Sequence, residues 1–174
     1  SVGIAISMYM GLRIGEVCAL QWKEIDLEKR VLTVSKTIQR VQCRTGSKQT
    51  KLIITEPKSE SSKRTIPIPD CLLPLLRRFK DNGEVYVVSG RKKPVEPRTM
   101  QYRFAKILHN ADLPSFHYHS LRHLFATRCV ELGFDVKTLS EILGHSSVEV
   151  TLNRYIHSDM ERKRTCMSLL SKCA

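Results

Sequence analysis

The stretch His119-Ser120-Leu121-Arg122-His123 opens a predicted helix over residues 119–132. His119 and Arg122 are three residues apart, so they share one face of that helix. This face lies near the helix N-terminus, where the partial positive charge of the backbone favours an anion. His123 is offset from the face and is expected to be structural. On its own the pair also fits a solvated polar face, so its meaning depends on the rest of the chain.

A histidine and a tyrosine follow toward the C-terminus. Asp135 caps a predicted short helix that Gly144 ends, and His145 comes directly after that glycine. Tyr155 stands ten residues after His145, on the apolar face of the next predicted helix. A histidine after a helix end is often only a partner for a local carbonyl, and a tyrosine on an apolar face is often a core residue. These two residues therefore gain meaning only in combination.

A third motif, Gly11-Leu12-Arg13-Ile14-Gly15-Glu16, falls inside a predicted single helix over residues 3–20. Its two glycines cost a helix about 1 kcal/mol each relative to alanine, so a ligand or a second helix must approach closely there. Arg13 interrupts an apolar pattern, and a buried arginine needs a partner, for which Glu16 is the obvious candidate. The pair is either a local ion pair or an anion site in which Glu16 orients Arg13.

Between these motifs the sequence predicts a small three-stranded antiparallel sheet. Apolar and β-branched residues predict strands at 31–38, 50–56 and 64–68. Lys58 lies in the turn from Pro57 to Lys63, and lysines in turns are usually solvated. The sheet and the helices together predict an α+β fold that is mostly helical.

Helical periodicity marks the other segments. Besides those named above, helices are predicted around residues 72–79, 98–110, 136–143 and 160–170. The helix over 98–110 should turn these residues inward: Met100, Phe104, Ile107 and Leu108. The apolar residues of the helix over 119–132 are Leu121, Leu124, Phe125, Cys129 and Leu132.

The composition describes a basic globular chain. Its net charge of +12, from 29 Lys and Arg against 17 Asp and Glu, favours a polyanionic partner. No apolar run approaches the roughly 20 residues of a membrane span. The six cysteines form no C-x-x-C pair, so reduced thiols in a cytosol are expected. The apolar start, Ser1 to Met10, lacks the features of a signal peptide, and it looks like the inside of a helix in a longer protein.

In their fixed order of arginine, lysine, His-x-x-Arg, histidine and tyrosine, these motifs resemble the catalytic domain of the tyrosine recombinases, the phage-integrase family. The resemblance covers nearly all 174 residues. It implies the integrase catalytic fold and a single catalytic domain over residues 1–174, a fragment without the N-terminal core-binding domain of the family. Its anchors are Gly11 to Leu20, Lys58 to Pro67, His119 to His123 with Ala126 and Thr127, Leu143-Gly144-His145, and Tyr155.

The resemblance also implies a role for each residue. Tyr155 would attack the scissile phosphate of DNA, form a 3′-phosphotyrosine and release a 5′-hydroxyl. A phenol has a pKa of about 10, so it needs proton removal, and His119 matches the position credited with that step. Arg13 and Arg122 match the two arginines that clamp the non-bridging oxygens.

Three further residues match supporting positions. His145 matches the histidine that hydrogen-bonds the phosphate, and Glu16 matches the acid that supports the active site. Lys58 matches the lysine credited with protonating the leaving 5′-oxygen. We prefer it to Lys63 because it directly follows the second predicted strand and stands nine residues before Pro67. Arginine forks would do what Mg²⁺ does in other phosphoryl transfers, so the resemblance implies no cofactor and no metal.

The implied partners are double-stranded DNA and other protomers of the same recombinase, as a tetramer on DNA, in the cytoplasm of a bacterium or encoded by a phage or other mobile element. A last helix, Met160 to Leu170, would fold back in cis or dock on a neighbouring protomer. Two other functions stay open, a type IB topoisomerase-like enzyme that relaxes DNA and a DNA-binding module that no longer cuts. The Leu143-Gly144-His145 context and the compact size favour the recombinase, and a mere binder has no need of Tyr155. A metal nuclease fits least, because no carboxylate cluster accompanies the histidines.

Overall fold

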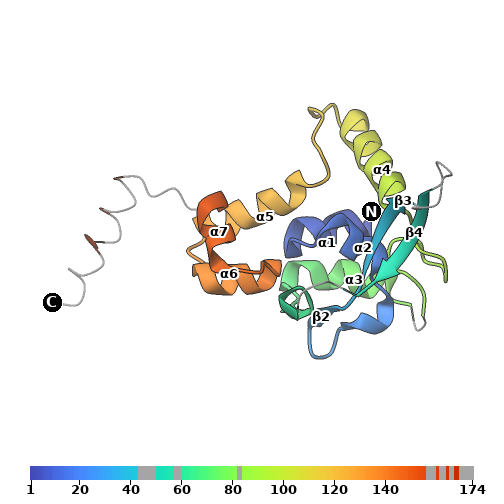
Figure 1. The fold of residues 1–174 in the computed structure, drawn as a ribbon, viewed down its shortest axis with the longest axis horizontal. Coiled ribbons are helices and arrows are strands. Elements are labelled where there is room, and N and C mark those ends of the chain that lie inside the picture. The colour runs from blue at the N-terminus through green and yellow to red at the C-terminus, as the bar shows by residue number, and fades with distance from the viewer. Residues whose placement is uncertain are drawn as a thin grey trace.

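The computed structural model describes residues 1–42, 50–56, 60–81, 84–155, 160, 164 and 167–168. Helices dominate, and small antiparallel sheets lie to one side of them (Figure 1), which confirms the predicted α+β class. The α-helices of the described part are α1 (Val2–Met10), α2 (Ile14–Ala19), α3 (Leu73–Phe79), α4 (Pro97–Asn110), α5 (Ser120–Glu131), α6 (Val136–Leu143) and α7 (Val148–Tyr155). Its strands are β1 (Ile25–Asp26), β2 (Val31–Val34), β3 (Thr37–Gln42), β4 (Thr50–Thr55) and β5 (Arg64–Pro67).

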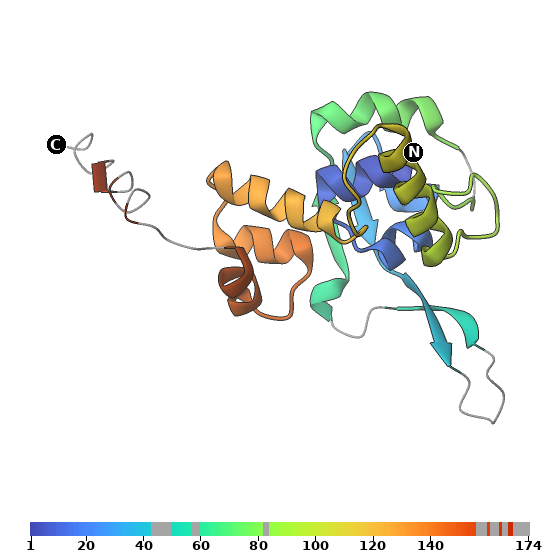
Figure 2. The same ribbon diagram turned by 90° about the horizontal axis from the view of Figure 1, so that it is seen from above.

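A three-stranded antiparallel sheet is present, but its membership differs from the prediction. The sheet has the order β1-β2-β5, with Leu32 opposite Ile66, while β3 and β4 form a separate two-stranded ribbon. The predicted strand over 31–38 therefore divides at Ser35, whose hydroxyl donates a hydrogen bond to the carboxylate of Glu24. The β3–β4 ribbon projects from the body, as Figure 2 shows.

The predicted single helix over residues 3–20 is wrong, because the chain turns between α1 and α2. Gly11 adopts a left-handed conformation with a φ of 66°, and its N–H donates to the Ser7 carbonyl to end α1. A β-carbon on Gly11 would lie 2.4 Å from the ring of Phe125 in α5. This glycine is therefore explained by the turn and by helix packing.

Gly15, the second glycine of that motif, lies where α2 meets β3. A β-carbon at this position would approach the Ile38 carbonyl oxygen to 2.6 Å. Close packing against a strand, which the sequence did not suggest, therefore accounts for the glycine.

The core surrounds α1, which is covered by α5 on one side and by α3 on another (Figure 1). Ile6 and Met10 of α1 pack with Leu32 of β2 and with Leu72 and Leu76. A second cluster joins α2 to α4 through Cys18, Met100 and Phe104, and a third joins α5 to α6. Burial raises the pKa of the Cys18 thiol to about 12.

Some apolar residues of α4 and α5 lie on the surface. Ile107, which was predicted to face inward, is 42% exposed, and Leu124 and Leu132 are more than half exposed. Ile107 is exposed because the buried stripe of α4 consists of Met100, Phe104 and Leu108, and Leu124 and Leu132 lie away from the buried face of α5.

Among the described residues, no helix is both long enough and apolar enough to cross a membrane. The described cysteines, Cys18, Cys71 and Cys129, are free thiols. The predicted last helix, Met160 to Leu170, lies mostly outside the described residues.

Candidate active site

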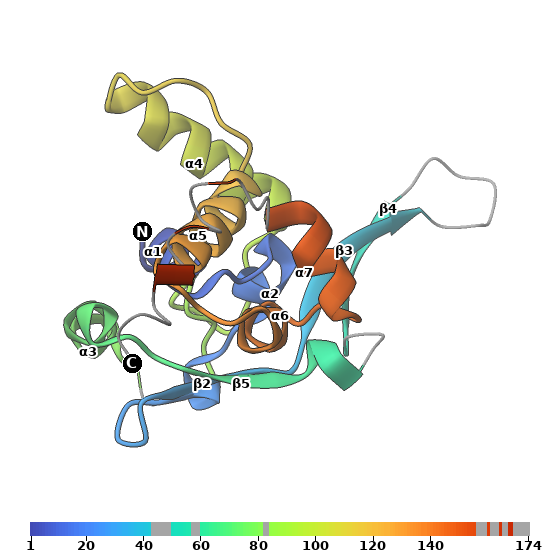
Figure 3. The same ribbon diagram turned by 90° about the vertical axis from the view of Figure 1, so that its left-hand side faces the viewer.

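The C-terminal end of α6 gathers three arginines from three distant parts of the chain. Arg64 donates from Nε to the carbonyl of Ile142 at 2.6 Å, and Arg122 donates from Nη2 to the carbonyl of Leu143 at 2.7 Å. Arg13 donates from Nη2 to the carbonyl of Gly144 at 3.0 Å. The last carbonyls of a helix lack partners within the helix and carry partial negative charge, so they suit cationic donors. Figure 3 shows α6 between α5, which carries Arg122, and β5, which carries Arg64.

Arg13 lies just before α2 and pairs with Glu16, the partner predicted from the sequence. Its backbone N–H donates to Oε2 of Glu16 and its Nη1 donates to Oε1, both at 2.8 Å. The side chain of Arg13 is 38% exposed, so part of the guanidinium faces solvent. This open part is where a bound anion would meet the arginine.

Glu16 is buried and shared between two arginines. Arg64 forms a fork on it, with Nη1 3.1 Å from Oε1 and Nη2 3.0 Å from Oε2. Burial by itself raises the pKa of Glu16, but the hydrogen bond and charge of Arg64, together with the charge of Arg13, hold this pKa below its ordinary value. The ionised carboxylate offsets only part of the charge of the three arginines, so the cluster stays positive.

Arg122 is almost completely buried, with 3% of the residue exposed. Its Nη1 donates to the Gly11 carbonyl at 2.8 Å, in addition to the bond to Leu143. The guanidinium therefore joins the end of α1 to the end of α6. A buried cation of this kind is tolerated because its donors meet carbonyl oxygens.

Two histidines are further candidate residues of the site. His145 follows α6 and is half-buried, and its Nδ1 is hydrogen-bonded to the buried Thr151 hydroxyl at 2.7 Å. This bond fixes the orientation of the imidazole ring, and sequence reasoning had missed Thr151. His119 occupies the cap position before α5 and is exposed. His123 is exposed as well, on the next turn of the helix.

The remaining two predicted residues are less fully described. Tyr155 is the last residue of α7, and its side chain lies outside the part of the chain that the structure describes. Lys58 also lies outside the described residues. Lys63, the alternative lysine, has its Nζ 2.5 Å from the carboxylate of Glu56. The roles of all these residues stay predictions.

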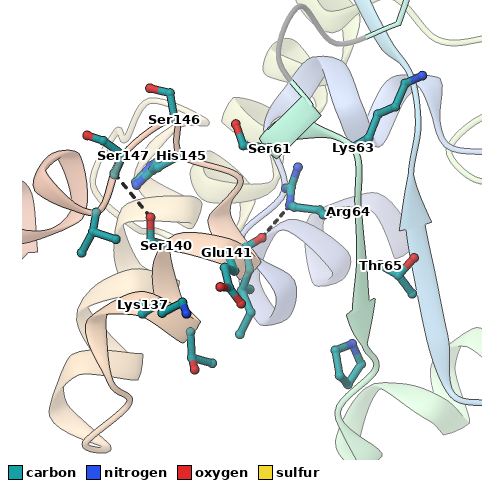
Figure 4. A pocket seen from close by; sticks show the side chains of 14 residues that line it. Ser61, Lys63, Arg64, Thr65, Lys137, Ser140, Glu141, His145, Ser146 and Ser147 are labelled. Carbon is teal, nitrogen blue, oxygen red and sulfur yellow. Dashed lines mark hydrogen bonds between the residues drawn. The ribbon is translucent and has the colours of Figure 1, made fainter.

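A cavity of about 590 Å³ opens beside the cluster, between β5, α6 and the start of α7. Figure 4 shows Lys63 and Arg64 on the β5 side of it, and Lys137 and His145 on the α6 side. The dashed line from Arg64 marks its bond to the Ile142 carbonyl. In the described ranges, no three His, Cys, Asp or Glu side chains are grouped so that they could hold a metal ion.

Arg64 is the residue of this cluster that sequence reasoning had missed. The only available signal was an arginine at the first position of a predicted strand. Its partner Glu16 is 48 residues away along the chain, so no local spacing connects them.

Comparison with known proteins places this arrangement in a family. The family model described as "Phage integrase family" matches residues 3–162. A "Tyrosine recombinase XerC-like" protein of Caldanaerobacter subterraneus subsp. tengcongensis is 33% identical over 180 residues, which cover 92% of this chain and 46% of the relative. The "ICEBs1 integrase" of Bacillus subtilis is 28% identical, covering 87% of this chain and 43% of its own length. The chain thus spans about half the length of the curated relatives it matches.

Solved structures agree with this result. The Tn1549 transposon integrase in complex with transposon right end DNA superposes with a TM-score of 0.74 and 29% identity, over 98% of this chain and 58% of that one. The XerH site-specific recombinase bound to difH substrate has a TM-score of 0.61 but 18% identity, so it supports the fold alone.

Proposed function

Because this chain belongs to the phage integrase family of tyrosine recombinases, we propose that it is the catalytic part of a site-specific recombinase that cuts and rejoins double-stranded DNA through a phosphotyrosine. The observation that carries the proposal is the convergence of Arg13, Arg122 and His145 at the end of α6. In sequence order these residues and Tyr155 match the family motif.

In the proposed reaction the phenolic oxygen of Tyr155 attacks the scissile phosphorus. The bond from phosphorus to the 5′-oxygen breaks, and a 3′-phosphotyrosine forms. His119 accepts the proton from the phenol, and Lys58 donates a proton to the leaving 5′-oxygen. Attack by a 5′-hydroxyl on the phosphotyrosine reverses these steps, so rejoining needs no ATP.

The charge that develops on the phosphate is stabilised by the cluster. Arg13 and Arg122 donate to the two non-bridging oxygens, and His145 adds a hydrogen bond. Preorganised donors are effective because they need no rearrangement during the reaction. Glu16 and the carbonyls at the end of α6 hold the two arginines in place before DNA arrives.

The net charge of +12 supports binding to the DNA backbone. We further propose that residues 1–174 act as one catalytic domain in the cytoplasm, where several protomers assemble on the DNA as a tetramer. The family resemblance is the support for this assembly.

A nicked duplex tests the proposal, because cleavage near a nick lets a short strand diffuse away and traps the covalent intermediate. The protein is incubated with a set of nicked duplexes carrying candidate core sites, in the presence of EDTA, and adducts that survive denaturant are measured. We expect an adduct with the unmodified protein and none with Tyr155→Phe. Tyr9→Phe, which removes the phenolic hydroxyl of an exposed tyrosine on α1, is the matched control and should react normally. An adduct that persists in Tyr155→Phe, or that forms only with a divalent metal, would contradict the proposal.

A further inference from the structure

Arg64 is a cation of the active-site cluster that the proposed reaction leaves without a role. Its side chain is 6% exposed. Nε donates to Ile142, Nη2 to Glu16, and Nη1 to both Glu16 and the carbonyl of Ser62. Since all three nitrogens of the guanidinium already donate to protein oxygens, Arg64 is not placed to clamp a phosphate.

We propose that Arg64 is a positioning residue that keeps Arg13 available for the scissile phosphate. This inference rests on the proposed function. Arg64 does so in two ways, by sharing the carboxylate of Glu16 and by fixing the end of α6.

The first effect is electrostatic. Each oxygen of Glu16 accepts one hydrogen bond from Arg13 and one from Arg64. Without Arg64, the full negative charge of Glu16 would act on Arg13 alone and would cancel most of its attraction for a phosphate. The carboxylate would also be free to turn toward the Arg13 guanidinium and occupy further donors. With Arg64 present, the carboxylate keeps one orientation and the Arg13 charge is only partly offset.

The second effect is geometric. Arg64 holds the carbonyl of Ile142, and the next two carbonyls, those of Leu143 and Gly144, hold Arg122 and Arg13. Gly144 has a φ of 64°, and a β-carbon there would lie 2.9 Å from Nη1 of Arg64. The arginine of β5 is therefore packed directly against the turn that presents His145.

Lysine cannot reproduce this arrangement. A lysine at position 64 keeps the positive charge but has a single nitrogen, whereas Glu16 and Ile142 are held by three nitrogens of a rigid fork. Arg64→Lys thus keeps the positive charge but loses the positioning of Glu16 and Ile142. Arg64→Met removes the charge as well.

The test measures single-turnover cleavage of the nicked duplex at saturating DNA, with two forms of the scissile linkage. One form is the ordinary phosphodiester, and the other is a methylphosphonate, which lacks one non-bridging negative charge. We expect Arg64→Lys and Arg64→Met to slow cleavage of the phosphodiester by about 10- to 100-fold, as for other residues that orient a catalytic group, with half-saturation by DNA changed by less than about threefold. On the methylphosphonate the loss should shrink to a few-fold, because less charge remains for Arg13 to stabilise.

The matched control is Arg30→Met, because Arg30 is an exposed arginine whose ion pair is with Asp70. This variant should cleave both substrates at the rate of the unmodified protein. Equal losses on the two substrates for the Arg64 variants, or no loss, would overturn the positioning role. If Arg64→Met does not fold, Arg64→Lys decides, and failure of both to fold would show a purely structural residue and overturn the proposal too. If the unmodified protein forms no adduct through Tyr155, the proposed function itself fails, which is a separate result.

Discussion

The arginines at the end of α6 and those on the surface make similar bonds in very different surroundings. Arg40 forks onto the carboxylate of Glu96 with Nε at 2.7 Å, yet the side chain of Arg40 is 46% exposed and that of Glu96 is 28% exposed. Arg64 makes the same kind of fork on Glu16 with both partners buried. Water and salt screen the first pair, while the second pair was desolvated on folding and must satisfy every donor and acceptor. A change in the buried cluster should therefore have large effects, and the same change on the surface should have small ones.

The largest effect is expected for Arg122. Arg122→Gln removes the cation and the donors to the carbonyls of Gly11 and Leu143, so single-turnover cleavage should fall by about 100- to 1,000-fold. The control is Arg128→Gln, because Arg128 lies on the same helix, is exposed and pairs with Glu131. Near-normal cleavage by Arg122→Gln would remove Arg122 from the proposed mechanism.

The next largest effect is expected for Glu16→Gln, and the quantity measured here is stability. Loss of the carboxylate leaves the buried Arg64 without its counter-charge, so we expect a decrease of about 3–5 kcal/mol in the free energy of unfolding. Urea unfolding monitored by circular dichroism gives this value. A decrease below about 1 kcal/mol, the range of surface pairs, would mean that the buried and exposed forks are equivalent.

The same carboxylate predicts a pH dependence. The pKa of Glu16 is lowered in the folded protein, so its contribution to stability is complete above the unfolded pKa of about 4.3 and is lost as the pH falls through the folded pKa. Unfolding measured between pH 7 and pH 3 should therefore show a steeper loss of stability for the unmodified protein than for Glu16→Gln. Parallel curves for the two proteins would be evidence against an ionised Glu16 in the fold.

A smaller effect is expected for Thr151→Val, which removes the hydroxyl bonded to Nδ1 of His145 and keeps the shape of the side chain. The ring orientation is then less restricted, and cleavage should slow by about 10-fold, in the range found for partners that orient a functional histidine. The readout is single-turnover cleavage beside the thermal midpoint. Thr127→Val, at an exposed position of α5, is the control. Equal rates for the two variants would indicate that His145 needs no such support.

The smallest effect is expected for Arg40→Met on the β3–β4 ribbon. Its fork with Glu96 is solvated, so the midpoint of thermal unfolding should shift by less than about 2 °C. A larger shift would remove the distinction between the two kinds of arginine.

The sequence revealed those parts of the site whose contacts are local. Arg13 and Glu16 are three residues apart, and Asp135 caps α6 by accepting a hydrogen bond from the Thr138 N–H, so spacing alone identified both features. Arg122 and Gly11 are 111 residues apart, and no periodic pattern brings them together. The family motif supplied the candidate residues for the chemistry, but it did not supply Arg64 or Thr151.

The errors in the predicted fold have the same origin. Apolar spacing predicts one helix through Gly11, because the close approach of Phe125, which leaves no room for a β-carbon in the left-handed turn, comes from a distant helix. The sequence predicts a single strand over 31–38. The division at Ser35 depends on a bond to Glu24 and on pairing with two different strands, which local composition does not reveal. In both places tertiary contacts outweigh local preference.

Three neighbouring carbonyls receive side chains that start 131, 78 and 21 residues away along the chain. Each guanidinium comes from a different segment, so a shorter piece of the polypeptide would hold only part of the cluster. The cluster is therefore complete only when the segments that carry the three arginines have all packed against the end of α6, so it is a product of the tertiary fold and not of any single segment.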